Sequence, residues 1–247
     1  QSDFLNMDLK SFNFKIFVGV IYLTLIAIVL LFLFSAIDIQ DLTNYNFIKS
    51  NRDIILSYKN DNFLSLTIFF FIFCIVWVLL LGFAMPLLLF AGFVFGKWWG
   101  IFIVLVSTTI GATLLYLLVG LFFKDFVEEK LAPKFSNLRK FFQKNDTTYF
   151  LLFRFIGGGG TPYAIQNVLP ILFNMPIKNY ILATLIGSMP SMFVTVAFGS
   201  GIESVIENNE EFNIINIISS PEIYFPLIGF FVILIAAFFV KKSFSNN

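Results

Sequence analysis

Several stretches of this chain consist almost entirely of apolar residues, and this feature limits the possible fold more than any other. A transmembrane helix needs about 20 consecutive apolar residues. Five segments predict such spans: Ile16–Ala36, Phe63–Leu81, Ile101–Phe123, Tyr180–Phe198 and Ile223–Val240. The fourth of them contains a helix-breaking sequence, Gly187-Ser188-Met189-Pro190. We therefore expect an all-α polytopic membrane protein.

The composition agrees with this class and excludes several kinds of site. Only 13% of the residues are charged, whereas soluble domains contain about 25%. The net charge of +1 argues against a nucleic-acid partner. The chain has no histidine and a single cysteine, Cys74, so we expect no metal site and no other cofactor. Without histidine or paired acids in the apolar segments, we also expect no catalytic residues and no enzyme activity.

Two further apolar segments are interrupted by glycine and proline. The first, Pro86–Trp99, is too short to span a membrane, and the second, Tyr149–Asn174, begins apolar and breaks at Gly157. Such segments are typical of re-entrant hairpins, and two of them in corresponding halves of a chain indicate a substrate site. Kinks within ordinary membrane helices are the alternative interpretation. Other residues assigned to the first hairpin and to close helix packing are Gly92, Gly96, Gly100 and Gly111.

The charged segments give partial information about topology. Lys124–Thr148 has six basic and four acidic residues, and Lys134–Lys144 within it has the spacing of a basic amphipathic helix. The positive-inside rule places this segment in the cytoplasm. The loop Gly201–Pro221 has four acidic and no basic residues, which suits the opposite side. The loop Ile37–Asn62 has mixed charge, and three spans from a cytoplasmic N-terminus would leave Lys124 outside, so the topology of the first half stays open.

The segment Arg154–Pro170 is polar and helix-breaking, although apolar sequence surrounds it. Arg154 lies within the apolar run Tyr149–Ile156, where a charge at the membrane centre costs roughly 2.5–3.5 kcal/mol. No carboxylate occurs in that run or in a neighbouring apolar run. Such an arginine binds either backbone carbonyls freed by the glycines or an anion such as a lipid phosphate. Snorkelling of its side chain to the headgroup region is the alternative.

Four consecutive glycines follow this arginine. Their backbone N–H groups are unshielded, and a new helix can start at Tyr163 behind Pro162, so the turn is suited to binding an anion. Gln166 and Asn167 add polar groups, although either amide alone is better explained as a hydrogen bond between helices. We predict a headgroup site for an anionic membrane lipid, formed by Arg154, Gly157, Gly158, Gly159, Gly160, Pro162, Tyr163, Gln166 and Asn167.

Two other patterns concern the membrane itself. Trp98 and Trp99 beside Lys97 indicate an anchor at the membrane–water interface. The abundance of Phe, Ile, Asn and Lys is typical of an AT-rich bacterial genome. We therefore expect a multi-pass protein of the bacterial cytoplasmic membrane.

The order of these motifs resembles that of the VTT-domain superfamily, which contains the bacterial DedA proteins and the SNARE-associated Golgi proteins. The similarity covers roughly Phe83–Gly201 and is greatest to the vesicle-trafficking branch. The first motif comprises Pro86, the segment Leu89–Gly96, Gly100, Gly111 and Tyr116. The second motif comprises Phe153, Arg154, Pro162, Tyr163, Asn167, Gly187, Pro190 and Gly199.

The resemblance implies two re-entrant hairpins that face each other inside a helical bundle. It also implies movement of phospholipid or polyprenyl phosphate between leaflets, without a cofactor. Arg154, Pro162 and Asn167 match the arginine, proline and asparagine of the family motif. Gly157 stands where the family usually has proline, and Leu121 where it has a basic residue. The first re-entrant segment also lacks the carboxylates of DedA proteins, which argues against a proton-driven mechanism.

The chain then divides into three parts. Residues 1–62 form an N-terminal transmembrane helix and polar loop, residues 63–201 a VTT-like membrane core with both re-entrant segments, and residues 202–247 an acidic loop and C-terminal transmembrane helix. We expect this protein to move or scramble anionic lipid. The alternatives are an ion-coupled transporter of small solutes, which the absence of acids at membrane depth disfavours, and a non-transporting scaffold that acts through the basic amphipathic helix.

Overall fold

The computed structural model describes residues 45–80, 82–136 and 145–207, together with residues 17–22, 24, 25, 27, 28, 31, 219–221, 223–232 and 235. This part of the chain is mostly helical and contains no β-strand. The elements are α3 (Tyr45–Asp61), α4 (Phe63–Leu79), α5 (Ala84–Phe122), α6 (Lys124–Leu131), α8 (Asp146–Phe155), the 3₁₀ helix η1 (Gly157–Gly160), α9 (Tyr163–Val168), the 3₁₀ helix η2 (Leu169–Phe173) and α10 (Ile177–Glu207). A further apolar helix spans Ile223–Val232. The all-α prediction is therefore confirmed.

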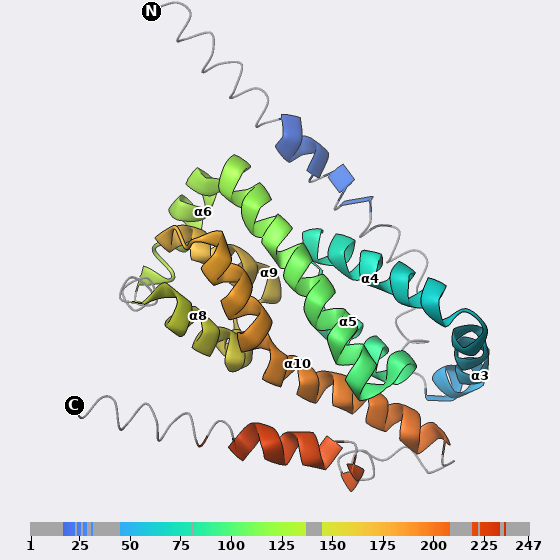
Figure 1. Ribbon diagram of the computed structural model, residues 1–247. Coiled ribbons are helices and arrows are strands. Elements are labelled where there is room, and N and C mark those ends of the chain that lie inside the picture. The colour runs from blue at the N-terminus through green and yellow to red at the C-terminus, as the bar shows by residue number, and fades with distance from the viewer. Residues whose placement is uncertain are drawn as a thin grey trace, which may run out of the picture.

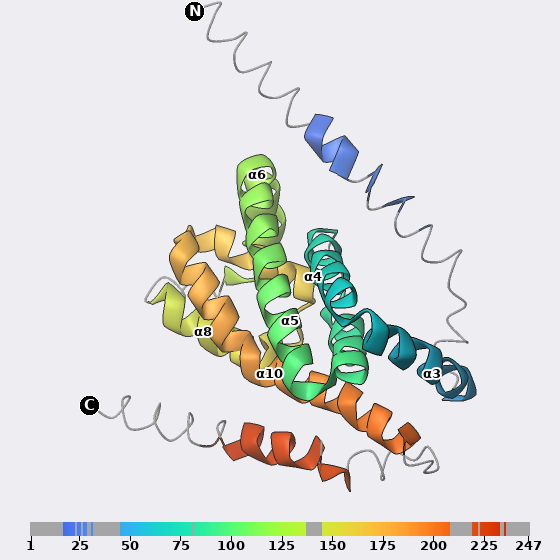
Figure 2. The same cartoon turned by 45° about the vertical axis from the view of Figure 1, so that its right-hand side comes forward.

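The helices α5 and α10 form the centre of the molecule, and the other helices lie around them. On one side of α5 lie α3 and α4, and on the other lies α8 (Figures 1 and 2). The helix Ile223–Val232 lies beside α10 on the outside of the bundle in both views. This arrangement places the segments after α8 between the two central helices.

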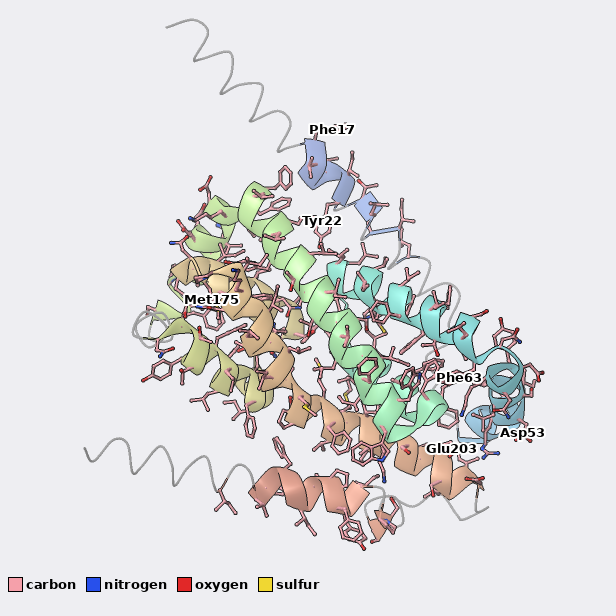
Figure 3. The ribbon with its side chains drawn as sticks, in the orientation of Figure 1. Phe17, Tyr22, Asp53, Phe63, Met175 and Glu203 are labelled. Atoms are coloured by element: carbon pink, nitrogen blue, oxygen red, sulfur yellow. The ribbon has the colours of Figure 1, made fainter. Side chains whose placement is uncertain are left out.

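Among the described residues, α5 and α10 are long and apolar enough to cross a membrane, and α3 with α4 make a third candidate whose parts meet at 107°. The described residues of the predicted span Ile16–Ala36 are helical as well. Tyr22 in that segment donates a hydrogen bond to the Leu79 carbonyl and lies 6.3 Å, ring to ring, from Phe123 (Figure 3). The chain is therefore an integral membrane protein with a packed helical core.

The long element α5 is two helices joined by a sharp reversal at Gly96, whose φ of 74° and ψ of 170° are not helical. The close approach of Gly100 to Ala91 proves the reversal, because a Cβ on Gly100 would lie 2.7 Å from the Ala91 carbonyl oxygen. In a straight helix, residues that far apart in sequence would be separated by about 13 Å. Pro86 lies in the first turn of the arm, where its missing N–H is not needed. The predicted reversal of the chain within the first hairpin (residues 84–100) is therefore confirmed.

Small residues allow this hairpin to pack directly against α10. A Cβ on Gly92 would overlap the backbone of Val196, and a Cβ on Gly199 would overlap the carbonyl of Leu89. Interfaces of this kind are common in membranes, because small residues let helix backbones approach closely and gain van der Waals contact. Both glycines therefore lie where the backbones of the hairpin and α10 are in direct contact.

The predicted break of the fourth span is wrong, because α10 remains helical through Gly187 and Pro190. The helix changes direction along its length (Figure 1), yet it does not unwind. Gly187 is needed for packing, since a Cβ there would lie 2.6 Å from the Leu151 carbonyl of α8. Pro190 removes one helical hydrogen bond, which membrane helices tolerate when neighbouring helices surround them.

Two predicted loops are partly helical. The segment Ile37–Asn62 contains α3, and Gly201–Pro221 begins with the end of α10. An ion pair between these two helices stabilises both, with Arg52 Nη2 2.6 Å from Glu203 Oε1. Glu203 lies where the end of α10 meets α3 (Figure 3). Most of the predicted amphipathic helix Lys134–Lys144 lies outside the described residues.

The core consists of two main hydrophobic clusters, one around each hairpin. The first contains Leu87 and Val94 of the first hairpin, packed with residues of α4, α5 and α10. The second contains Phe150 and Leu172 of the second hairpin (residues 146–173). Tyr163 packs against both clusters. Tyr163 of the second hairpin therefore links the two clusters inside the bundle.

Candidate functional site

The second hairpin is built from four short helical pieces, α8, η1, α9 and η2, that local sequence signals delimit. Its first arm, α8, is capped by Asn145, whose side chain accepts a hydrogen bond of 3.0 Å from the backbone N–H of Thr148. The return arm begins at Tyr163 behind Pro162 and ends at Asn174, which has a left-handed φ of 49°. Arg154 lies in the last turn of the first arm.

All four glycines of the tip have positive φ angles: 69° at Gly157, 75° at Gly158, 58° at Gly159 and 81° at Gly160. A residue with a Cβ costs roughly 1–2 kcal/mol in the left-handed region, so only glycine can occupy four such positions in succession cheaply. This backbone requirement explains the run of glycines. Three of the four are exposed, and Gly158 is buried against the side chain of Gln166.

The Arg154 side chain is almost fully enclosed, with 1% of its surface exposed. Its Nη1 donates to Gln166 Oε1 at 3.3 Å, and its Nη2 donates to Asn167 Oδ1 at 2.5 Å. The guanidinium carbon lies 5.0 Å from the ring centre of Phe150 and 5.5 Å from that of Tyr163, within the range of cation–π attraction. This burial argues against snorkelling of Arg154 to the headgroup region.

No carboxylate pairs with Arg154 among the described residues. Asp146 instead accepts hydrogen bonds from Thr147 and Asn179, and Glu203 pairs with Arg52. Within the part of the chain that the structure describes, amide oxygens, the Tyr180 hydroxyl and aromatic faces therefore surround the positive charge. A buried charge without a counter-ion is costly, because lost hydration is not replaced.

The surroundings of this charge contain polar atoms that lack hydrogen-bond partners. Native proteins satisfy nearly all buried polar groups, so each exception needs an explanation. Every one of these groups can donate a hydrogen bond, and with the guanidinium they form a set that complements an anion. Arg154 Nε and Ser188 Oγ have no hydrogen-bond partner, whereas Tyr163 Oη, Asn167 Nδ2 and Thr184 Oγ1 make only longer polar contacts, of Tyr163 with Thr108 and Asn167 and of Thr184 with Tyr180.

Gln166 links the glycine tip to the arginine. Its Nε2 donates to the carbonyl oxygens of Thr161 at 2.6 Å and Gly157 at 3.2 Å, while its Oε1 accepts from Arg154. Part of its role is therefore structural, as the hydrogen-bond interpretation of this amide predicts. Four predicted site residues lie exposed at the tip and have no described contact with the guanidinium: Gly157, Gly159, Gly160 and Pro162.

Tyr180 belongs to this site, although the sequence analysis did not identify it. Its fully buried hydroxyl lies 3.4 Å from Arg154 Nη2 and also reaches the carbonyl oxygens of Asn167 and Ala112, at 3.1 and 3.2 Å. Its ring stacks on Tyr116, with 4.6 Å between ring centres. The predicted residue Tyr116 therefore supports the site from a second layer.

A periodic signal could have identified Tyr180. Tyr180, Thr184 and Ser188 recur at every fourth position of α10, so they form a polar stripe on one face of an otherwise apolar helix. All three are buried. A tyrosine at the start of a membrane helix ordinarily indicates an interfacial anchor, so Tyr180 by itself did not suggest a buried polar stripe.

The first hairpin adds no comparable chemistry. Its predicted residues Pro86, Gly92, Gly96 and Gly100 shape its backbone and its contact with α10. Among the described residues, no group of three His, Cys, Asp or Glu side chains could hold a metal ion.

Residues 82–201 match the family model of the VTT domain. This region contains both hairpins and most of α10, and therefore the whole arrangement around Arg154. No solved structure matches the chain.

Proposed function

We propose that this chain, which belongs to the VTT-domain family of DedA and SNARE-associated Golgi proteins, moves anionic lipid between the leaflets of a membrane. VTT domains are membrane-associated and connected with transport. The observation that carries the proposal is the buried charge of Arg154, which has no carboxylate partner in the described part of the chain and lies among hydrogen-bond donors without a close partner.

A lipid phosphate is the anion that a membrane supplies to such a site. Guanidinium groups bind phosphate through two parallel hydrogen bonds, and here the bond to one oxygen can come from the Nε atom that lacks a partner. Asn167, Ser188 and Thr184 can donate to the remaining phosphate oxygens. The acyl chains would stay in the bilayer while the headgroup passes between the hairpins.

The enclosed guanidinium implies a movement during transport. Gln166 and Asn167 occupy two of its hydrogen-bonding positions, and both belong to the return arm α9. A phosphate therefore reaches Arg154 when α9 shifts relative to α8, and the glycine tip between these arms is the natural hinge. Backbone rotations at such a hinge cost little, because glycine populates both signs of φ.

The proposal includes a phospholipid or polyprenyl phosphate as substrate, and the bacterial cytoplasmic membrane as location. It includes no covalent step, because moving a headgroup between leaflets breaks no bond, and hence no enzyme activity or cofactor. Ion coupling is not part of it, because the described acidic residues of α10, Glu203 and Glu207, lie at its end beside Arg52.

Transport is tested in liposomes that contain a fluorescent phosphatidylglycerol and a quencher confined to the outer solution. The wild-type protein should accelerate loss of the inner-leaflet signal relative to empty liposomes. Arg154→Lys keeps the charge but loses the planar fork, so we expect transport to be about tenfold slower.

Arg52→Lys is the matched control, since it makes the same chemical change at an ion pair outside the hairpins and should leave transport near the wild-type rate. Equal rates for wild-type protein and empty liposomes would overturn lipid transport as the function. An unchanged rate in Arg154→Lys would instead overturn the role of the guanidinium fork.

A further inference from the structure

A groove opens on the outside of the bundle, between the first hairpin, α10 and the helix Ile223–Val232. Its volume of about 330 Å³ lies at the small end of ligand pockets, which range from about 300 to 1,000 Å³. Lys97 and Trp98 contribute from the hairpin and Phe193 from α10. The outer wall consists of residues from the apolar helix that lies beside α10 in both ribbon views.

The lining has the polarity of a lipid molecule. Among the described residues that line the groove, Lys97 carries a charge and the others are apolar or aromatic. The Trp98 ring packs on Phe193, with 5.3 Å between ring centres. A tryptophan beside a lysine is typical of headgroup depth, so this end of the groove lies at the interface and the aromatic walls extend toward the acyl chains.

One wall of the groove contains a glycine. Gly229 lines it, and a Cβ at this position would meet no atom within 4 Å. The neighbouring Phe230 stacks on Phe155 of α8, with 5.8 Å between ring centres. Phe155 follows Arg154 in the sequence, so the groove lies directly beside the arm that carries the buried guanidinium.

We propose that this groove binds an anionic phospholipid, with one acyl chain against the aromatic walls and the phosphate on the Lys97 ammonium. An ammonium binds phosphate as a point charge, and the volume suits part of one acyl chain rather than a whole lipid. The idea that lipid passes from this groove to Arg154 rests on the proposed function. Lipid binding to the groove is measured separately from transport.

The test uses Trp98 as a reporter of acyl-chain binding. The chain has three tryptophans, so replacing Trp77 and Trp99 with phenylalanine leaves a single fluorophore at the groove. The detergent-solubilised protein is titrated with phosphatidylglycerol or phosphatidylcholine that carries bromine on the acyl chains. We expect saturable quenching, with tighter binding of the anionic lipid.

Two variants distinguish the headgroup contact from the acyl contact. Lys97→Gln should weaken phosphatidylglycerol binding by about fivefold, as expected for the loss of one basic contact, and leave phosphatidylcholine unchanged. Gly229→Leu should fill the groove and weaken binding of both lipids. Gly120→Leu is the matched control, because a Cβ on Gly120 also meets no atom within 4 Å but lies outside the groove lining.

Quenching that rises without saturation, or that is the same in Gly229→Leu as in the control, would overturn the groove as a lipid site. Equal affinity for the two lipids would overturn the contact with Lys97. Saturable binding in a protein that does not accelerate lipid movement in liposomes would support the groove and overturn the proposed transport, so the two failures are distinguishable.

Discussion

The two hairpins have similar outlines but pack in opposite ways. The first is held by backbone contacts, with Gly92 against Val196 and Gly199 against Leu89, and its buried side chains are apolar. The second surrounds an ionised side chain, Arg154, with amides and hydroxyl groups. The same difference appears at the tips, where one hairpin reverses at a single positive-φ glycine and the other at four.

This difference suggests that the first hairpin mainly stabilises the fold and that the second mainly serves the proposed transport. Helix association within a membrane is driven mainly by van der Waals packing, and the first hairpin maximises it by omitting side chains at its contacts. A buried charge contributes little to stability and is expensive at membrane depth, so we attribute its presence in the second hairpin to the proposed binding of an anion. Changes in the first hairpin should therefore affect unfolding, and changes around Arg154 should affect transport at constant or even increased stability.

The largest effect is expected from Gly92→Ala, which adds one methyl group to the tightest backbone contact of the first hairpin. The new Cβ would overlap the Val196 carbonyl of α10, and a backbone cannot move aside as a flexible side chain can. We expect the free energy of unfolding in mixed detergent micelles to fall by about 3 kcal/mol. Gly120→Ala, where a Cβ meets nothing, should not lower it. Equal stability of the two variants would contradict the packing role of this hairpin.

Asn167→Asp should have the next largest effect, and it should change stability and transport in opposite directions. The carboxylate would replace the amide oxygen that lies 2.5 Å from Arg154 Nη2 and would supply the missing counter-charge. We expect the free energy of unfolding to rise by about 2 kcal/mol, because a charged partner strengthens a buried hydrogen bond. Lipid movement in liposomes should almost stop, because an incoming phosphate would meet a like charge and a guanidinium that is already paired.

Gln166→Glu is the matched comparison for this variant. It also places a carboxylate beside Arg154, but it removes the amide N–H groups that hold the carbonyl oxygens of Thr161 and Gly157. It should therefore be less stable than Asn167→Asp while transport is equally impaired. If Asn167→Asp transports lipid at the wild-type rate, the space around Arg154 is not the path of an anion.

The hairpins were predictable from the sequence because glycine and proline are conspicuous in apolar segments. The segment Pro86–Trp99 is too short to span a membrane, and the polar segment after Arg154 cannot continue a membrane helix. Helix-breaking residue types alone do not determine whether a helix breaks. Pro190 shows this, because packing of α10 against its neighbours keeps the helix continuous there.

The features of the fold and the site that the sequence did not predict depend on contacts between segments that are distant in the chain. A local sequence pattern contains no information about such contacts. The α3 helix was predicted as a loop from its charges, but Arg52 finds its partner Glu203 on α10, far along the chain. The sequence around Tyr180 is typical of an interfacial anchor, yet the fold places its hydroxyl beside Arg154. The sequence indicated which hairpin carries polar chemistry but did not show that the guanidinium is enclosed.

The smallest effect on the free energy of unfolding is expected from substitutions at the hairpin tips. Replacing a tip glycine with alanine or with asparagine distinguishes two kinds of positive-φ backbone. Gly159 has the left-handed helical angles φ 58° and ψ 37°, which asparagine tolerates, and a Cβ there meets only Ile156 at 3.9 Å. Gly159→Ala should therefore cost about 1 kcal/mol in the free energy of unfolding, and Gly159→Asn clearly less.

Gly96 differs, because its φ of 74° and ψ of 170° lie in a region that is essentially restricted to glycine. A Cβ at Gly96 also meets no atom within 4 Å, so backbone strain alone should separate the variants. Asparagine should therefore cost as much as alanine at Gly96, and less than alanine at Gly159. Unfolding of the four variants in mixed micelles measures this difference. If the asparagine variant is more stable than the alanine variant at both tips, or at neither tip, the two hairpins turn by the same kind of backbone geometry.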